Sequence, residues 1–166
     1  YQKANANTDV TAINNLTNFE ISKDHISSGL NNVVRNTNLK GRWQILSKNP
    51  KVICDTAHNK EGLQIVMHQL KKENYKELHI VLGVVNDKKL NDVLPLFPKK
   101  AIYYFCKPNI PRGLSEEELM QNGNNYGLIG DFFSSVKKAY NKALSNANQE
   151  DIVYIGGSTF VVAEII

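Results

Sequence analysis

The chain has 166 residues, 42% of them hydrophobic and 22% charged, which suits one globular domain with a sizeable core, so we do not expect these residues by themselves to form a large multidomain enzyme. Its 20 basic and 16 acidic residues give a net charge of +4, but the basic residues are scattered in separate pairs, which argues against a nucleic-acid partner. The apolar runs are far shorter than the roughly 20 residues of a membrane span, and the N-terminus has no signal-peptide pattern, so we expect a cytoplasmic protein without membrane contact.

The first part of the chain is predicted to be helical. Apolar residues recur there at helical spacing, and Ser22 is a candidate cap for a second helix. The pattern changes at Gly41, so we expect a helical segment over residues 1–39 and an α/β domain over residues 40–166. The apolar positions that carry the helical prediction are Val10, Ile13, Leu16, Ile26, Leu30 and Val33.

A strand pair should follow Gly41. Residues 43–46 form one short apolar run and residues 52–54 form the next, separated by a polar turn at residues 48–50. Because this connection is too short to hold a crossover helix, the two strands should be antiparallel.

Beyond this pair, apolar runs alternate with amphipathic segments, which is typical of βαβ units with a parallel sheet. The predicted strands span residues 52–55, 78–83, 101–106 and 152–155, with a brief edge strand at 126–129. The sequence therefore predicts an α/β fold: a Rossmann-like, mostly parallel sheet with flanking helices and one antiparallel strand.

Helices are predicted between these strands. The first, residues 59–73, should bury Leu63, Val66, Met67 and Leu70, and a second carries Leu90, Val93 and Leu94. The pattern Ser115-Glu116-Glu117-Glu118 predicts a capping box at the start of a short helix. A longer helix after Asp131 and a last helix over residues 160–166 complete the prediction; the longer one carries Phe132, Val136, Tyr140 and Leu144 at four-residue spacing.

Cys54 and Cys106 each lie within an apolar run and are far apart in the sequence. This placement favours buried free thiols in a reducing compartment over a disulfide or a metal site. Metal-ligand spacings such as CxxC or HExxH do not occur, so we predict no metal site from this chain.

Polar residues follow the predicted strands at their carboxyl ends, where open α/β sheets bind ligands. Asp55 and His58 follow one strand, Lys107 and Arg112 follow another, and a glycine-rich turn, Gly156-Gly157-Ser158-Thr159, follows the last. Together they suit an anionic ligand such as a phosphate or a carboxylate. Each also has a structural interpretation: the turn as an ordinary tight turn, Asp55 as a helix cap and His58 as a structural hydrogen-bonding group.

Several well-known motifs are missing from these 166 residues. The sequence contains no G-x-x-x-x-G-K-[ST] phosphate loop, no G-x-G-x-x-G and no G-x-S-x-G. A self-sufficient nucleotide hydrolase or a Rossmann dehydrogenase is therefore not expected.

Four segments of the sequence form one ordered set: residues 41–46 (GRWQIL), 52–62 (VICDTAHNKEG), 83–88 (GVVNDK) and 155–158 (IGGS). Taken in order, they resemble the C-terminal domain of the folylpolyglutamate synthase/dihydrofolate synthase family, ATP-dependent amide ligases of the Mur ligase superfamily. The opening Tyr1-Gln2-x-x-Asn5 and the helix after it resemble the end of the central ATPase domain of that family.

The resemblance implies a reaction in which MgATP phosphorylates a folate or pteroate carboxylate and L-glutamate attacks the acyl phosphate. It also implies that the phosphate loop and the magnesium ligands belong to the protein's own N-terminal ATPase domain, upstream of this chain, and that the fragment is inactive alone. It implies, as site residues, Asn5 at the adenine, Arg42 at the ATP phosphates, Asp55 at the ribose or hinge, and His58 and Ser158 near glutamate. Asp87, Lys88 and Arg112 match recurrent family positions without an assigned role.

Two other functions remain open at this point. One is a ligase of the same superfamily that adds an amino acid to a UDP-linked muramyl substrate. The other is a non-catalytic α/β module that binds an anionic nucleotide through its glycine turn. If the chain belongs to a folate ligase, as the resemblance implies, we expect a monomer that binds L-glutamate, folate or dihydropteroate, and ATP, and that does not bind nucleic acid.

Overall fold

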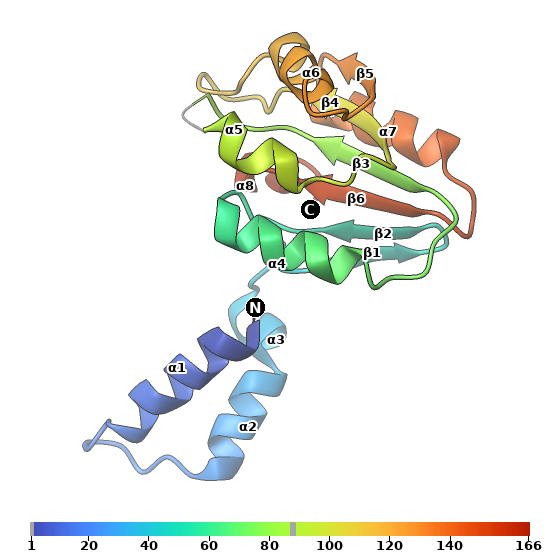
Figure 1. Ribbon diagram of the computed structural model, residues 1–166. Coiled ribbons are helices and arrows are strands. Elements are labelled where there is room, and N and C mark those ends of the chain that lie inside the picture. The colour runs from blue at the N-terminus through green and yellow to red at the C-terminus, as the bar shows by residue number, and fades with distance from the viewer. Residues whose placement is uncertain (1, 87–88) are drawn as a thin grey trace. The chain divides into compact units, whose positions relative to one another are not determined.

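The computed structural model describes residues 2–86 and 89–166, and it divides the chain into two compact units (Figure 1). The first unit is Tyr1–Lys40 and the second is Gly41–Ile166. Among the described residues, no helix is long and apolar enough to cross a membrane.

The first unit consists of the helices α1 (Gln2–Asn14), α2 (Lys23–Asn31) and α3 (Val33–Thr37). The predicted cap at Ser22 is confirmed: its Oγ accepts from the His25 backbone N–H at 3.1 Å, and His25 Nδ1 accepts from the Ser22 N–H. None of the side chains described in residues 5–40 is buried, so this unit has no core of its own within that range. Its exposed apolar side chains are Leu16, Phe19, Ile21, Leu30, Val34 and Leu39.

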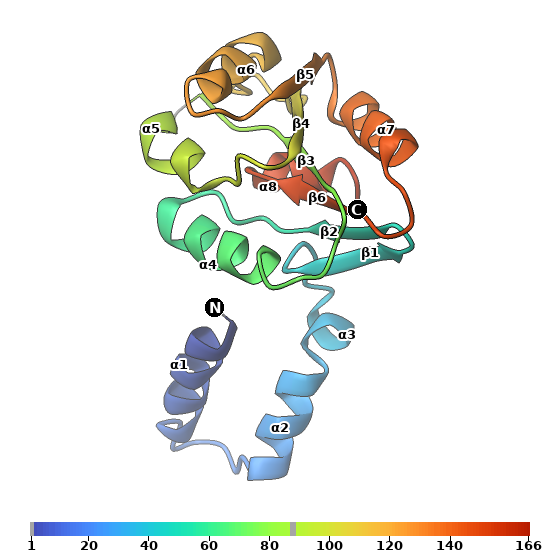
Figure 2. The same cartoon turned by 45° about the vertical axis from the view of Figure 1, so that its right-hand side comes forward.

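The second unit is built on a six-stranded sheet with the strand order β1-β2-β6-β3-β4-β5. β1 and β2 pair antiparallel, as the short turn between them predicted, and every other pairing is parallel. β1 and β5 form the two edges (Figure 2). The strands are β1 (Gln44–Lys48), β2 (Lys51–Cys54), β3 (Leu78–Leu82), β4 (Ile102–Cys106), β5 (Gly130–Phe133) and β6 (Ile152–Gly156).

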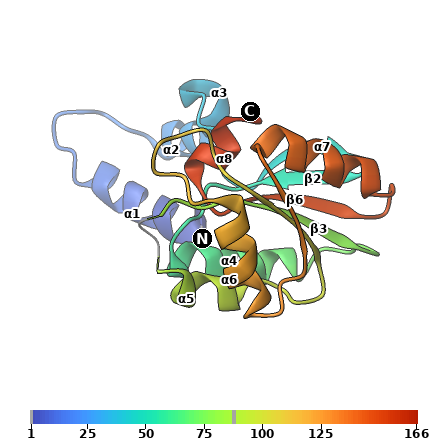
Figure 3. The ribbon, with the colours of Figure 1, turned by 90° about the horizontal axis from the view of Figure 1, so that it is seen from above.

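Helices cover both faces of the sheet, which gives three layers (Figure 3). One face carries α7 (Val136–Asn146) and α8 (Thr159–Ala163), and the other carries α4 (Lys60–Leu70), α5 (Leu90–Val93) and α6 (Glu116–Asn124). A 3₁₀ turn, Leu94–Leu96, continues α5. The predicted fold class is thereby confirmed.

The buried face of α4 was predicted correctly. Leu63, Val66, Met67 and Leu70 are its buried residues, and Asn59 caps it through a bond from the Gly62 N–H to Asn59 Oδ1 at 2.9 Å. The strands β3 and β6 are buried along their whole length, because helices cover both faces of a parallel sheet.

Three local predictions were wrong. Ser115 precedes α6 but its side chain makes no cap hydrogen bond, so the capping box is absent from this described segment. The edge strand lies at Gly130–Phe133 and not at residues 126–129. Phe132 therefore belongs to β5, and the helix that it was predicted to join begins at Val136, capped by Ser135.

Both cysteines are free and buried, as predicted. They belong to one apolar cluster that packs α7 and α8 against the sheet. Burial, assisted by the neighbouring Asp55 charge, raises the pKa of the Cys54 thiol to about 11, and burial also raises the pKa of Cys106. These thiols therefore stay protonated near neutral pH and serve as small core side chains.

Candidate functional site

The candidate site lies at the carboxyl ends of β2, β6 and β3, which are adjacent and parallel. The chain leaves β2 for α4 and β3 for α5 on one face of the sheet, but it leaves β6 for α8 on the opposite face (Figure 3). In open α/β sheets ligands bind at such a change of direction. The end of β6 is therefore the place at which to look for functional groups.

Asp55 follows β2 and is completely buried. Its Oδ2 accepts a hydrogen bond from the Trp43 backbone N–H at 2.7 Å, and its Oδ1 accepts from the Ala57 N–H at 2.8 Å. The helix cap that the sequence left open for Asp55 is supplied by Asn59 instead. Asp55 thus ties the segment before β1 to the segment after β2.

Arg42 is carried on the segment that Asp55 holds, and its side chain is exposed. Further backbone bonds fix this segment: the Thr56 N–H donates to the Gly41 carbonyl at 2.9 Å, and the Gly41 N–H donates to Gln44 Oε1 at 2.8 Å. Gly41 has a φ of +72°, and a Cβ there would meet Thr56 Cγ2 at 2.8 Å. Trp43 also has a positive φ, +46°, so the backbone on both sides of Arg42 is closely specified.

His58 lies in the loop between β2 and α4, and its side chain is exposed. Its Nδ1 is 3.0 Å from the Thr56 carbonyl oxygen. Because a carbonyl oxygen only accepts hydrogen bonds, Nδ1 carries the proton, and Nε2 is the ring nitrogen that can meet a ligand.

The glycine-rich turn after β6 packs tightly against the end of β3. Gly157 has a φ of +91°, and a Cβ there would lie 2.6 Å from Leu82 Cδ1 and 2.7 Å from the Gly83 carbonyl oxygen. Ser158 is buried, with 2% exposure, and its Oγ accepts from the Phe160 N–H at 3.2 Å as the cap of α8. The hydroxyl hydrogen of Ser158 remains able to donate to a ligand.

Arg112 reaches the same region from the loop after β4. Its guanidinium carbon lies 5.1 Å from the centre of the Phe160 ring, a cation–π distance. The backbone pairs this loop with the one after β3, through the Asn86 N–H to the Arg112 carbonyl at 2.9 Å and the Leu114 N–H to the Val84 carbonyl at 3.0 Å. Asp87 and Lys88, which the sequence also singled out, lie outside the described residues.

A cavity of about 640 Å³ lies beside this edge, at the ends of β4 and β5. Two lysines and two serines contribute to its lining, which suits an anion; Lys107 is among them, but Arg42, Asp55, His58 and Ser158 are not. The lining residues are Lys107, Pro108, Asn109, Ile110, Pro111, Ser134, Ser135, Lys137 and Glu164.

The structure thus brings Asp55 and Ser158 to the ends of neighbouring strands, with Arg42 and His58 on the segments around Asp55. Asn5 belongs to the first unit, where it is exposed on α1. Sequence reasoning missed the backbone of Trp43 as the partner of Asp55, and the Phe160 ring beneath Arg112. No local signal could have found either, because Trp43 is 12 residues from Asp55 and Phe160 is 48 residues from Arg112.

This arrangement can bind and orient anions. A guanidinium such as that of Arg42 can grip a phosphate through two parallel hydrogen bonds, and an imidazole or a hydroxyl can hold a carboxylate. The cysteines do not take part, since both thiols are buried and protonated. The chemistry that the described residues support is therefore ligand positioning and not nucleophilic attack by the protein.

Comparison with known proteins agrees with this description. Residues 41–159 match the family model of the Mur ligase, glutamate ligase domain. The dihydrofolate synthase/folylpolyglutamate synthase of Escherichia coli (strain K12) is 31% identical over 165 residues, a match that covers 98% of this chain and 37% of that protein. Nearly the whole of this chain therefore matches the relative, but the chain spans well under half of the relative's length.

Solved structures give the same result. E. coli FolC in complex with ADP, without folate substrate, superposes with a TM-score of 0.84 at 29% identity, covering 97% of this chain and 38% of that one. A bifunctional folylpolyglutamate synthase/dihydrofolate synthase with Mn, AMPPNP and L-glutamate bound gives a TM-score of 0.76 at 27% identity, covering 89% of this chain and 34% of that one. The resemblance inferred from the four sequence segments is confirmed, and the chain belongs to the family of the Mur ligase, glutamate ligase domain.

Proposed function

We propose that this chain is the C-terminal domain of an ATP-dependent folate ligase that joins L-glutamate to dihydropteroate or to a folylpolyglutamate through an acyl phosphate. The observation that carries the proposal is the similarity to the E. coli dihydrofolate synthase/folylpolyglutamate synthase over 98% of this chain. The exposed Arg42, held on a rigid segment at the sheet edge, supports it on chemical grounds.

Arg42 is proposed to contact the phosphates of ATP. Its guanidinium would offset the negative charge that develops as the phosphoryl group moves to the folate carboxylate. Asp55 is buried and already accepts two backbone hydrogen bonds, so we propose that it acts mainly as a positioning residue that fixes the Arg42 segment. Its contact with the nucleotide ribose stays a prediction.

His58 and Ser158 are proposed to lie near the incoming glutamate. The Nε2 of His58 can hold a glutamate carboxylate, and the Ser158 hydroxyl can donate a second hydrogen bond. Both belong to the loops at the ends of β2 and β6, which are neighbouring strands. Arg112, fixed over Phe160, adds a positive charge on the α8 side of the same edge.

The phosphoryl-transfer groups are proposed to come from an ATPase domain like that of the family, since these 166 residues contain no phosphate loop. The ligands of Mg²⁺ would belong to that domain as well. The exposed apolar side chains of residues 16–39 and the exposed Asn5 fit a segment that completes such a domain on its adenine side. The sequence-based expectation of a cytoplasmic monomer forms part of the same proposal.

The test measures glutamate-dependent ADP release by the complete ligase with dihydropteroate, with tetrahydrofolate and with a UDP-muramyl acceptor. Activity with either pteridine acceptor and none with the UDP-muramyl compound is the expected result. Activity with the UDP-muramyl acceptor alone would contradict the proposal. Micromolar nucleotide binding by the 166-residue chain without any ligase activity of the complete protein would favour a binding module.

Two substitutions separate the proposed roles. Arg42→Ala should lower kcat by more than about tenfold, because a guanidinium on the transferred phosphate acts in the transition state. His58→Gln should instead raise the KM for glutamate with little change in the KM for ATP. Lys48→Ala, at the other end of β1, removes an exposed cation of the same sign and should leave both constants unchanged. A normal kcat in Arg42→Ala would remove Arg42 from the site.

A further inference from the structure

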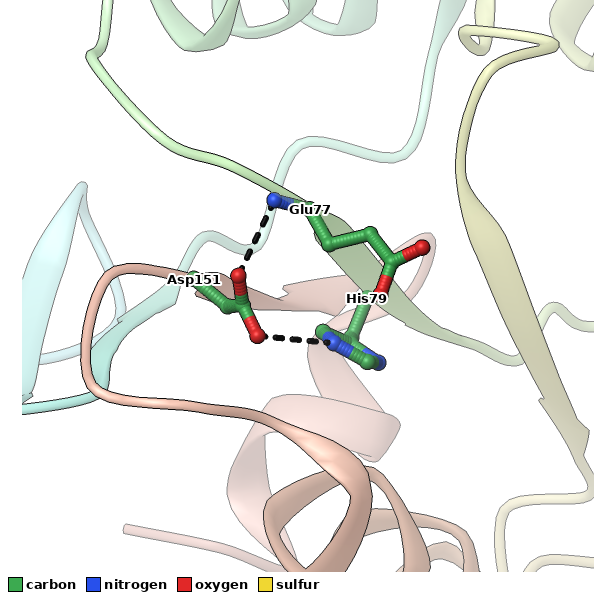
Figure 4. Close-up of side chains that lie close together, drawn as sticks. All are labelled: Glu77, His79 and Asp151. Atoms are coloured by element: carbon green, nitrogen blue, oxygen red, sulfur yellow. Dashed lines mark hydrogen bonds and ion pairs between the residues drawn. The ribbon is translucent and has the colours of Figure 1, made fainter.

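A second polar cluster lies at the opposite end of the strands, where β3 and β6 begin. Glu77 and His79 flank the first residue of β3, and Asp151 directly precedes β6 (Figure 4). One ligand atom from each of these three side chains lies within 4.8 Å of the others. Glu77 is exposed, whereas His79 and Asp151 are buried.

His79 is the unusual member of this cluster, because its ring is completely buried. Its Nδ1 lies 3.0 Å from the Tyr104 hydroxyl oxygen. Its Nε2 is buried without a hydrogen-bond partner among the residues that the structure describes. That nitrogen faces Asp151 Oδ2 at 3.7 Å, which is too long for a hydrogen bond (Figure 4).

Asp151 is held in place by the backbone. Its Oδ1 accepts from the Glu77 N–H at 3.0 Å, and its Oδ2 accepts from the Asn148 N–H at 2.6 Å. A carboxylate with a fixed position thus faces a buried imidazole nitrogen that lacks a partner within the described part of the chain.

A metal ion resolves this arrangement better than a proton does. Buried polar atoms are almost always paired, and a proton on Nε2 would still lie too far from Asp151 to form a good hydrogen bond. A Zn²⁺ ion binds imidazole nitrogen and carboxylate oxygen at about 2.0–2.2 Å, so two ligands at tetrahedral angles lie about 3.4 Å apart. The observed 3.7 Å between Nε2 and Oδ2 is close to that spacing.

We propose that Glu77, His79 and Asp151 bind a divalent transition-metal ion of the Zn²⁺ type, with water in the fourth position. Glu77 is long and exposed, so its carboxylate can turn toward the ion without disturbing the core. The neighbouring cation Lys76 pairs with Glu150. An imidazole ligand favours Zn²⁺ over Mg²⁺ or Ca²⁺, which prefer oxygen ligands.

Tyr104 has a supporting role in this proposal. When Nε2 binds the metal ion, Nδ1 must carry the ring proton and donate it to the Tyr104 hydroxyl oxygen, as the 3.0 Å distance allows. The oxygen of Tyr104 also accepts from Asn146 Nδ2 at 3.0 Å, so its position is fixed from α7. The ion would therefore join the starts of β3 and β6 at the end of the sheet away from Arg42 and Ser158, and its role would be structural.

The experiment is calorimetric titration of the whole 166-residue chain with Zn²⁺ after treatment with a chelator. We expect one ion per chain, and Glu77→Gln should weaken its binding by more than tenfold. This variant changes only an exposed side chain, so it should fold normally, which circular dichroism without metal will check. Tyr104→Phe should weaken binding by about 10–100-fold, as other outer partners of metal-bound histidines do. His68→Gln removes an exposed imidazole from α4 and is the matched control.

A second readout uses thermal unfolding. Free Zn²⁺ at about 100 times its Kd should raise the Tm of the unmodified chain by about 5–10 °C, and it should raise that of Glu77→Gln far less. The proposal is overturned if the chain binds no Zn²⁺, or if Glu77→Gln binds it as tightly as the unmodified chain does. It is also overturned if His68→Gln abolishes binding, because the ion then occupies a surface site. None of these results depends on ligase activity, so the proposed function stands or falls separately.

Discussion

Two buried aspartates occupy opposite ends of neighbouring parallel strands. Asp55 follows β2 at its carboxyl end, and Asp151 precedes β6 at its amino end. Each accepts one backbone hydrogen bond from a residue distant in the sequence and one from a residue two or three positions away. A buried carboxylate held by backbone amides therefore occurs at both ends of the sheet.

The two aspartates differ in what their partners carry. Asp55 holds the segment that presents the exposed Arg42, at the edge where the glycine turn and His58 also lie. Asp151 instead holds the start of β3 and faces the buried imidazole of His79. We therefore expect the same substitution to affect the proposed catalysis at one end of the sheet, and metal binding and stability at the other.

The largest effect is expected from Asp55→Ala in the proposed complete ligase. Ligase activity should fall by more than about tenfold, because the Arg42 segment loses its anchor. The free energy of unfolding should also fall by about 2–5 kcal/mol, since two backbone N–H groups lose their acceptor and one of them is buried. Kinetics on the folded fraction, with urea unfolding in parallel, measures both, and activity within twofold of normal would refute the anchoring role.

Asp151→Ala is the matched change at the other edge. Without metal, the free energy of unfolding should fall by about 1–3 kcal/mol, because the Glu77 and Asn148 N–H groups are only partly buried and can bind water. The kcat of the folded enzyme should stay within about twofold of normal, since no group of the proposed site contacts Asp151. A tenfold loss of kcat in a fully folded variant would show that the two ends of the sheet are coupled.

The sequence predicted the sheet better than it predicted its edges. The strands β3 and β6 are continuous apolar runs, because both of their faces are covered, and they were located to within one residue. β5 is an edge strand that contains Asp131 and the exposed Phe132, so it lacks such a run. The spacing of Phe132 from Val136 also imitated a helix, although the bond from the Lys138 N–H to Ser135 Oγ begins α7 after Phe132.

At the candidate site, residue types were predictable but partners were not. Strand-end positions followed from the alternation of strands and helices, which is why Asp55, His58 and Ser158 could be singled out. One interpretation of the sequence made Asp55 the cap of α4, but Asn59 is the capping residue. Asp and Asn are equally suitable as caps, so the sequence alone does not show which of the two caps the helix. The His79–Asp151 pair spans 72 residues, a separation that no ligand-spacing rule covers.

The close packing of the glycine turn after β6 against the end of β3 can be tested by substituting two glycines. Gly157→Ala should lower the free energy of unfolding by about 2–4 kcal/mol, because it combines a φ of +91° with a Cβ only 2.7 Å from the Gly83 carbonyl oxygen. Gly29→Ala in α2 meets nothing within 4 Å and should instead raise helix stability by about 0.5–1 kcal/mol. Thermal unfolding followed by far-ultraviolet circular dichroism compares them, and equal effects of the two would contradict the close packing at Gly157.

The smallest effect is expected in the core between the two ends of the sheet, where Cys54 and Cys106 lie in one apolar cluster. With a pKa of about 11, Cys54 would be only ~0.1% thiolate at pH 8, and burial further blocks the approach of a reagent. Iodoacetamide at pH 8 should therefore modify neither thiol within the time that fully modifies the urea-unfolded chain, as mass spectrometry will show. Asp151→Ala should speed this modification only as far as its lower stability populates open states, whereas Lys48→Ala should not change it. Rapid reaction of the thiols in the native chain without substitutions would mean that the core opens without global unfolding. The end of the sheet at Asp55 and the end at Asp151 could then not be treated as parts of one rigid sheet.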